Sequence, residues 1–213
     1  MMKDLIIVGA SGHGREVLDI IERINDINPT YNILGFVDDN SEIQGNIING
    51  VTVLGGISYL KKLLCEREIF VVIAIANADT KRKLSKELEG LALWTNIIDP
   101  TVIVSKYCSL GYGNIIGPYS WIGPNSKIGN FCDCVFACSV GHDVVIEDYV
   151  SIMDYCDITG HDYLESGVYL GSSVAIIPEI KIVKDCILGA GAVVVKDIVE
   201  QGTYTGVPAK RLK

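Results

Sequence analysis

The most constraining feature of the chain is an apolar residue at every sixth position of its second half. Between Val104 and Val194, fifteen of these sixteen positions are aliphatic and the other is Cys134. A helix repeats every 3.6 residues and cannot produce this spacing, whereas a strict six-residue recurrence is typical of a β-helix that stacks short strands into a prism. The sequence therefore predicts such a prism over residues 98–213, with a C-terminal tail.

The same register accounts for many glycines and cysteines. Glycine often directly follows the aliphatic position, where we expect the chain to turn a corner. The position two residues before the aliphatic one also faces inward, because strand side chains alternate. Five of the seven cysteines occupy that position: Cys108, Cys132, Cys138, Cys156 and Cys186. We interpret them as small buried hydrophobic side chains, and the absence of a C-x-x-C pair gives no support to a zinc site.

The first half of the chain follows a different pattern. Short aliphatic runs alternate with amphipathic segments, which predicts a small Rossmann-like α/β domain over residues 1–97. The turn Gly9–Gly14 follows the first strand and opens a helix, a context in which backbone N–H groups hold phosphate. Asp38 and Asp39 end the second strand, where carboxylates can bind ribose hydroxyls or a base; a ligand-free tight turn and a solvated loop are the alternatives.

Composition excludes several classes of function. A net charge of −8 argues against nucleic-acid binding, which needs a concentrated basic surface. No apolar run reaches the roughly 18 residues of a membrane span, so we expect no integral membrane segment. The first residues resemble neither a signal nor a transit peptide, and we expect a cytoplasmic protein.

The order of these parts is informative. The turn GASGHG, the pair Asp38–Asp39, the six-residue repeat and the segment Gly206–Arg211 together resemble the sialic acid O-acetyltransferase-like family of hexapeptide-repeat acyltransferases. Within that family the chain is similar to bacterial N-acetyltransferases of UDP-linked 4-amino sugars. The resemblance implies a left-handed β-helix of 18-residue coils, association as a homotrimer, acetyl-CoA as co-substrate, a nucleotide-linked amino sugar as partner, and no metal.

The resemblance also implies positions for both substrates. The nucleotide sugar would contact Ser11, Gly12, His13, Asp38, Asp39 and Ile75, and acetyl-CoA would contact Ser151, Gly171, Ser172, Gly189 and Ala190. Ser151 stands where well-known members have a second histidine, so one thioester contact is altered or missing. Lys196, Lys210 and Arg211 would either meet CoA phosphates or be solvated.

Two Gly-His-Asp triplets recur in the prism, at residues 141–143 and 160–162. The attacking amine must lose a proton, which requires a base that titrates near neutrality, and histidine meets this requirement. His142 falls at a corner and should be exposed, and Asp143 could orient its ring, although the family usually has glutamate there. Gly160 lies one coil after His142 and is a candidate oxyanion donor, whereas His161 is a polar corner residue or a ligand contact.

The leading hypothesis is therefore acetyl transfer from acetyl-CoA to the 4-amino group of a nucleotide-linked 4-amino-4,6-dideoxy sugar, with His142 as general base. O-acetylation of a sugar such as sialic acid and a non-catalytic sugar-nucleotide sensor are the alternatives. A zinc-dependent carbonic anhydrase on the same prism needs three converging histidines. His13 lies outside the prism, which leaves two.

Overall fold

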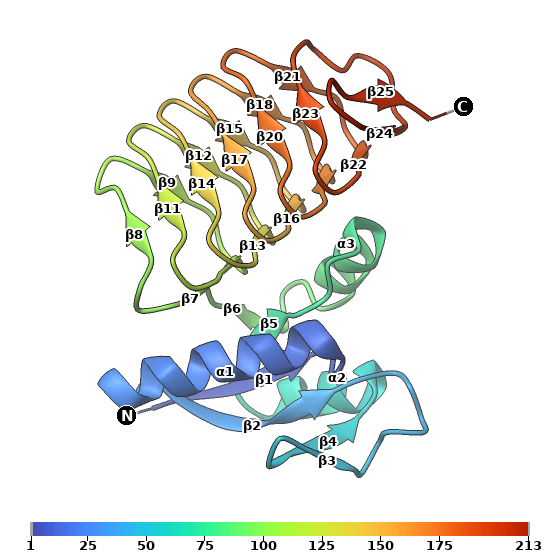
Figure 1. The fold of residues 1–213 in the computed structure, drawn as a ribbon. Helices are drawn as coiled ribbons and strands as arrows, with labels where there is room; N and C mark the ends of the chain where they lie inside the picture. The colour runs from blue at the N-terminus through green and yellow to red at the C-terminus, as the bar shows by residue number, and fades with distance from the viewer. Residues whose placement is uncertain (1, 213) are drawn as a thin grey trace. The chain divides into compact units, whose positions relative to one another are not determined.

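The computed structural model describes residues 2–212, which form two compact units (Figure 1). The first unit ends at Pro100 and the second begins at Thr101, three residues beyond the boundary expected from the sequence. Strand β7 (Ile97–Ile98) contacts helix α1 (Gly12–Ile27), and Arg23 of α1 lies 2.8 Å from the Asp99 carboxylate. These contacts attach the junction residues to the first unit.

The first unit is a mainly parallel α/β sheet. Its strand order is β3-β4-β2-β1-β5-β6, and only the β3–β4 pair is antiparallel. The strands are β1 (Lys3–Val8), β2 (Tyr31–Val37), β3 (Ile47–Ile48), β4 (Val51–Gly55), β5 (Phe70–Ile73) and β6 (Leu93–Trp94), and the helices are α1, α2 (Ile57–Glu66) and α3 (Ala78–Glu87). The end of β1, residues 5–8, is buried without alternation, as in strands covered on both faces.

The second unit is a parallel β-helix with three faces. The first face contains β8 (Ile103–Val104), β11 (Trp121–Ile122), β14 (Ser139–Val140), β17 (Asp157–Ile158), β20 (Ala175–Ile176) and β23 (Val193–Val194). The second contains β9 (Ser109–Leu110), β12 (Lys127–Ile128), β15 (Val145–Ile146), β18 (Tyr163–Leu164) and β21 (Lys181–Ile182). The third contains β10 (Ile115–Ile116), β13 (Asp133–Cys134), β16 (Ser151–Ile152), β19 (Tyr169–Leu170), β22 (Ile187–Leu188), β24 (Thr203–Thr205) and the antiparallel β25 (Lys210–Arg211). Partners such as Ser139 and Asp157 lie one 18-residue coil apart.

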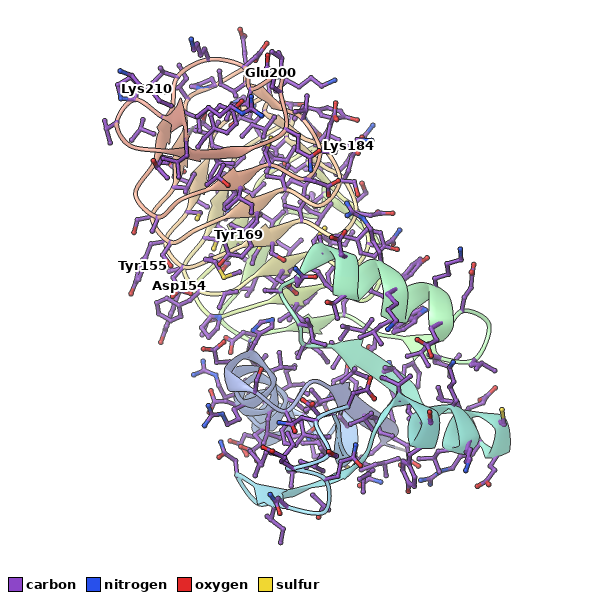
Figure 2. The ribbon with its side chains drawn as sticks, turned by 90° about the vertical axis from the view of Figure 1, so that its right-hand side faces the viewer. Asp154, Tyr155, Tyr169, Lys184, Glu200 and Lys210 are labelled. Atoms are coloured by element: carbon purple, nitrogen blue, oxygen red, sulfur yellow. The ribbon has the colours of Figure 1, made fainter. Side chains whose placement is uncertain are left out.

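The interior of the prism follows the six-residue register. From Ile116 to Val194 every residue of the aliphatic series is at most 5 % exposed. Cys132, Cys134, Cys138, Cys156 and Cys186 are buried free thiols, and burial raises the pKa of Cys156 to about 12. Their interpretation as small core side chains is therefore confirmed, whereas Cys108 at the N-terminal coil is half-buried. Corner side chains instead project outward, as Tyr155 does in Figure 2.

Glycine was expected after the aliphatic position because the chain turns a corner there, but the structure gives a different reason for it. Gly117 does not adopt a left-handed conformation; a Cβ there would lie 1.6 Å from the carbonyl oxygen of Val135 in the next coil. The left-handed residue comes two positions later and is usually not glycine, for example Tyr119, Asp143 or His161. Glycine is therefore needed for the close approach of successive coils, not for the backbone angle of the turn.

Within residues 2–212 the structure has no helix with the length and apolar character needed to cross a membrane.

Candidate active site

His142 and Asp143 occupy the corner between β14 and β15. The His142 side chain is 57 % exposed, and its Nδ1 lies 2.8 Å from Oδ2 of Asp143. This hydrogen bond lowers the pKa of the Asp143 carboxyl. Asn125, one coil earlier, donates to the other carboxylate oxygen over 3.2 Å. An ionised carboxylate accepts only, so we assign the proton to Nδ1, which leaves Nε2 of His142, on the side of the ring next to Gly160, able to accept a proton.

Gly160 lies against the His142 ring, one coil further along, as the register predicted. A Cβ on Gly160 would lie 2.6 Å from Cε1 and 2.7 Å from Nε2 of His142. The ring therefore occupies space that only a glycine leaves open. With the His142 ring in this position Gly160 is buried, yet its N–H has no hydrogen-bond acceptor among the described residues.

The second triplet continues the same corner. His161 is exposed, and its backbone N–H donates to the carbonyl of His142 over 3.1 Å. The two imidazole rings meet edge to face with centroids 5.1 Å apart. Asp162 points inward, is 1 % exposed, and accepts hydrogen bonds from the N–H groups of Thr159 and Ile180. Burial raises the pKa of the Asp162 carboxyl to about 6 against the opposing effect of these two donors.

The carboxyl ends of β1, β2 and β5 surround a cavity of about 220 Å³ in the first unit. Gly9, Asp38, Asp39 and Ile75 line it, at the edge of the sheet where open α/β folds bind ligands. Asp38 also accepts from the Ala10 N–H over 2.9 Å, which ties the glycine turn to β2. Asp39 accepts from the Ile57 N–H over 2.8 Å at the start of α2. Both aspartates thus have structural contacts in addition to lining the cavity.

Ser11, Gly12 and His13 form the N-terminal end of α1 and do not line this cavity. Ser11 and Gly12 are exposed, whereas the His13 side chain is 14 % exposed and lies 3.2 Å from Glu16. A Cβ on Gly14 would lie 2.0 Å from the Gly9 carbonyl oxygen, so this glycine permits the tight strand-to-helix turn.

Two further lining residues, Thr80 and Lys83, come from α3. They were missed in the sequence because the helical segment beginning at Thr80 looks like an ordinary solvated face. The one sequence feature that could have indicated them is that α3 directly follows β5, which brings the first turns of this helix to the carboxyl edge of the sheet. Lys83 supplies a cation beside two carboxylates, a combination suited to a ligand with both phosphate and hydroxyl groups.

The expected acetyl-CoA residues lie on other parts of the prism. Gly171 and Ser172 form the corner between β19 and β20, and Gly189 and Ala190 form the same corner one coil later. A Cβ on Gly171 would lie 2.7 Å from the Ala190 nitrogen. This corner and the His142 corner border opposite edges of the first face, so one chain does not bring these residues together with His142.

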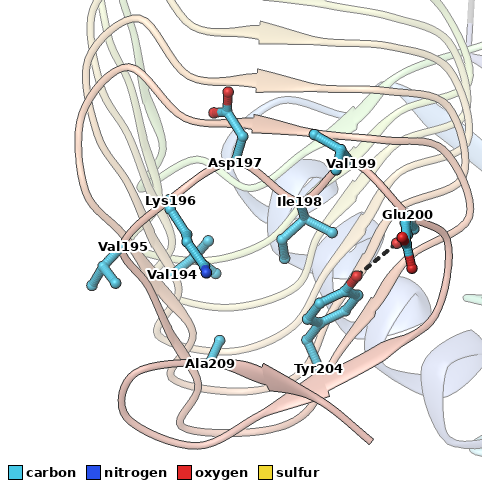
Figure 3. Close-up of a pocket in the computed structure, with 9 residues that line it drawn as sticks. All are labelled: Val194, Val195, Lys196, Asp197, Ile198, Val199, Glu200, Tyr204 and Ala209. Carbon is cyan, nitrogen blue, oxygen red and sulfur yellow. Dashed lines mark hydrogen bonds between the residues drawn. The ribbon is translucent and has the colours of Figure 1, made fainter.

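Ser151 is buried on the third face, where its hydroxyl donates to the Asp133 carboxylate over 3.1 Å. It is therefore engaged within its own chain. Two of the basic residues expected to meet CoA phosphates or to be solvated have different surroundings. Arg211 pairs with Glu200 at 2.8 Å. Lys196 lines a hollow of about 190 Å³ at the C-terminal end of the prism (Figure 3). In this hollow the Tyr204 hydroxyl donates to the Glu200 carbonyl over 2.8 Å.

Comparisons with known proteins agree with both units. Residues 4–88 match the family model of the PglD N-terminal domain. GDP-perosamine N-acetyltransferase of Escherichia coli O157:H7 is 31 % identical over 191 residues, which are 87 % of this chain and 82 % of that protein. A mutant of perosamine N-acetyltransferase from Caulobacter crescentus, solved with CoA and GDP-perosamine, is 26 % identical with a TM-score of 0.89, covering 100 % of this chain and 98 % of that one.

A third similarity concerns the fold alone. The acetyltransferase domain of PglB from Neisseria gonorrhoeae superposes with a TM-score of 0.90 at 24 % identity, over 99 % of this chain and 100 % of that one. The prism is therefore the left-handed β-helix of the hexapeptide-repeat acyltransferases. This chain belongs to the family of acetyl-CoA-dependent sugar N-acetyltransferases that join a small α/β domain to a hexapeptide-repeat β-helix.

Proposed function

We propose that the protein transfers acetyl from acetyl-CoA to the 4-amino group of a nucleotide-linked 4-amino-4,6-dideoxy sugar. The observation that carries this proposal is the exposed His142 ring at a prism corner, whose Nδ1 contacts Asp143 and whose Nε2 has no hydrogen-bond partner among residues 2–212. A relative named GDP-perosamine N-acetyltransferase makes a GDP-linked amino sugar the first candidate acceptor.

His142 acts as the general base in this proposal. The amine nitrogen attacks the thioester carbonyl carbon and passes a proton to Nε2 of His142, which gives a tetrahedral intermediate. Collapse of that intermediate breaks the carbon–sulfur bond and leaves acetyl on the nitrogen as the amide, while the CoA thiolate departs and takes the proton from the His142 imidazolium. Asp143 holds the ring in the tautomer that can accept a proton and stabilises the imidazolium that forms.

Gly160 is the proposed oxyanion donor. Its N–H has no hydrogen-bond acceptor among the described residues, as an oxyanion site requires. Gly160 is buried and the His142 ring lies against it, so a thioester oxygen reaches this N–H only after neighbouring groups move.

The nucleotide part binds to the first unit in this proposal. Asp38, Asp39 and Ile75 line the cavity at the carboxyl edge of the sheet, and Lys83 adds a cation. Ser11, Gly12 and His13 stand at the start of α1, where the helix dipole and the first backbone N–H groups favour phosphate.

Acetyl-CoA is proposed to lie along the corner of Gly171, Ser172, Gly189 and Ala190, whereas Ser151, which is buried and hydrogen-bonded to Asp133, takes no part. Because this corner and His142 border opposite edges of one face, the reaction needs His142 of one protomer beside the acetyl-CoA corner of another. A homotrimer with three such interfaces satisfies this requirement. We place the enzyme in the cytoplasm, where acetyl-CoA and nucleotide sugars are formed.

The test is to incubate the purified protein with acetyl-CoA and GDP-, dTDP- and UDP-linked 4-amino-4,6-dideoxyhexoses and to read products by mass spectrometry. We expect a gain of one acetyl group on one sugar, lost in His142→Ala. Acetylation of a hydroxyl in sialic acid instead, or tight nucleotide-sugar binding without turnover, would contradict the proposal. Mass detection is preferred because free thiols of the protein interfere with thiol-release assays.

A further inference from the structure

Three potential metal ligands converge at the His142 corner. One ligand atom from each of His142, Asp143 and His161 lies within 4.8 Å of the other two. The imidazole rings are nearly perpendicular, at 85°, with centroids 5.1 Å apart. The general-base role uses His142 and Asp143, but it gives no function to His161.

The backbone fixes the spacing of these ligands. Asp143 and His161 occupy the same corner position in successive coils, and both adopt the left-handed conformation, with φ of 57° and 64°. The His161 N–H donates to the His142 carbonyl, so the two turns are joined by the hydrogen-bond ladder of the prism. The ligands are therefore held on a rigid element, and only side-chain rotations remain to be made on binding.

The chemistry of the ligands favours a transition metal. Two imidazoles and one carboxylate suit Zn²⁺ and its neighbours, whereas Mg²⁺ and Ca²⁺ prefer oxygen ligands. Asn125 donates to Oδ1 of Asp143, which leaves Oδ2 for the His142 ring or for a cation, and a cation held between Oδ2 and Nδ1 would replace the Nδ1 proton. Both histidines are exposed, which leaves room for a metal ion and its water.

We propose that His142, Asp143 and His161 form an inhibitory binding site for Zn²⁺ or a similar transition-metal cation. The inhibitory part rests on the proposed function: a metal bound to Nε2 of His142 occupies the lone pair that the amine proton needs, and a metal bound to Nδ1 moves the ring proton to Nε2, so the base is lost in either case. Acetyl transfer itself requires no metal in this scheme, so binding lowers activity.

Binding is tested first, without either substrate. Metal-free protein is titrated with Zn²⁺ against a chromophoric chelator and with Co²⁺, whose visible absorption reports coordination. The titrations use a Cys65→Ser background, because Cys65 is an exposed thiol. We expect one site per chain, with affinity lowered at least about tenfold in His161→Asn. His13→Asn, which also removes one histidine, is the matched control and should bind Zn²⁺ like its parent.

Inhibition is tested second. Zn²⁺ should reduce acetyl transfer, and EDTA should restore it. For His161→Asn, inhibition is measured relative to the variant's own metal-free rate. The Zn²⁺ concentration that halves this rate should be raised by the same factor by which the substitution weakens Zn²⁺ binding. Equal Zn²⁺ binding by His161→Asn and His13→Asn would overturn the site. Binding without inhibition of an active enzyme would overturn the inhibitory role. Absence of acetyl transfer to any sugar would refute the proposed function but leave the substrate-free titration interpretable.

Discussion

Nδ1 of His142 lies 2.8 Å from Oδ2 of Asp143, and both side chains are at least one-third exposed. The pair therefore has the arrangement of a base and its orienting carboxylate, but in contact with water rather than buried. Screening by solvent weakens such a pair compared with a buried one, so the carboxylate should contribute less here than in a buried catalytic triad.

Asp143→Asn tests this contribution. Asparagine tolerates the left-handed backbone of this position, so the corner should keep its shape. Loss of the charge should reduce kcat by about ten- to a hundredfold, less than the loss in a buried triad, with little change in the KM for acetyl-CoA. Steady-state kinetics with both substrates measure this, and a variant with the wild-type kcat would show that Asp143 does not orient the base.

Gly160→Ala tests the packing of the His142 ring. The new Cβ would lie 2.6 Å from Cε1 of His142, so the ring must move, and it can move into solvent at little cost in stability. We expect kcat to fall about tenfold or more while the melting temperature changes little. A double-mutant cycle provides the control: added to His142→Asn, Gly160→Ala should cause little further loss, because the ring is already gone. Independent, additive losses would assign Gly160 a role separate from the ring.

The sequence predicted this corner well because the prism is periodic. Each residue keeps its depth and its neighbours 18 positions away, so the exposure of His142 and its contact with Gly160 could be read from the register. Properties that depend on contacts between elements could not. The placement of Lys83 at the cavity depends on the packing of α3, which periodicity does not encode. The register does place Val135 beside Gly117 and Asp133 beside Ser151, one coil apart, but it gives neither the closeness of the first pair nor the burial of Ser151.

Lys83→Met tests whether the cavity of the first unit holds the nucleotide sugar. Methionine keeps the apolar stem but removes the charge, so the KM for the nucleotide sugar should rise about tenfold, with the KM for acetyl-CoA unchanged. Lys86→Met is the matched control, because Lys86 lies on the same helix and does not line the cavity. Equal effects of the two substitutions would mean that only the overall charge of α3 matters.

Asp162→Asn tests the buried carboxylate beneath the second triplet. Burial raises the pKa of Asp162 to about 6 in the folded chain, above its usual value of 3.8. Between pH 4 and 6 the folded state therefore binds a proton that the unfolded state has released, and the free energy of unfolding falls as pH rises, by about 2 to 3 kcal/mol in total.

Asparagine cannot titrate, so this contribution should disappear in the variant. It also loses one of the two accepted hydrogen bonds, but that loss does not depend on pH. Urea denaturation of both proteins from pH 4 to 7 gives the difference in free energy of unfolding at each pH. This difference should change by about 2 to 3 kcal/mol between pH 4 and 6 and then stay constant; a difference independent of pH would show that Asp162 titrates normally.

Mixed oligomers test whether the active site combines two protomers. His142→Asn removes the base, and Ala190→Trp places a large side chain on the exposed acetyl-CoA corner, at the opposite edge of the first face. Each variant alone should retain only a small residual activity, because every interface lacks one half of the site. Co-expressed chains that assemble at random should recover about a quarter of the wild-type activity, since one interface in about four then pairs an intact base with an intact corner. Mixing the separately assembled proteins is the control and should recover none. If co-expression also restores no activity, His142 and the Ala190 corner must serve the same site within one chain, and the proposed arrangement of protomers would be wrong.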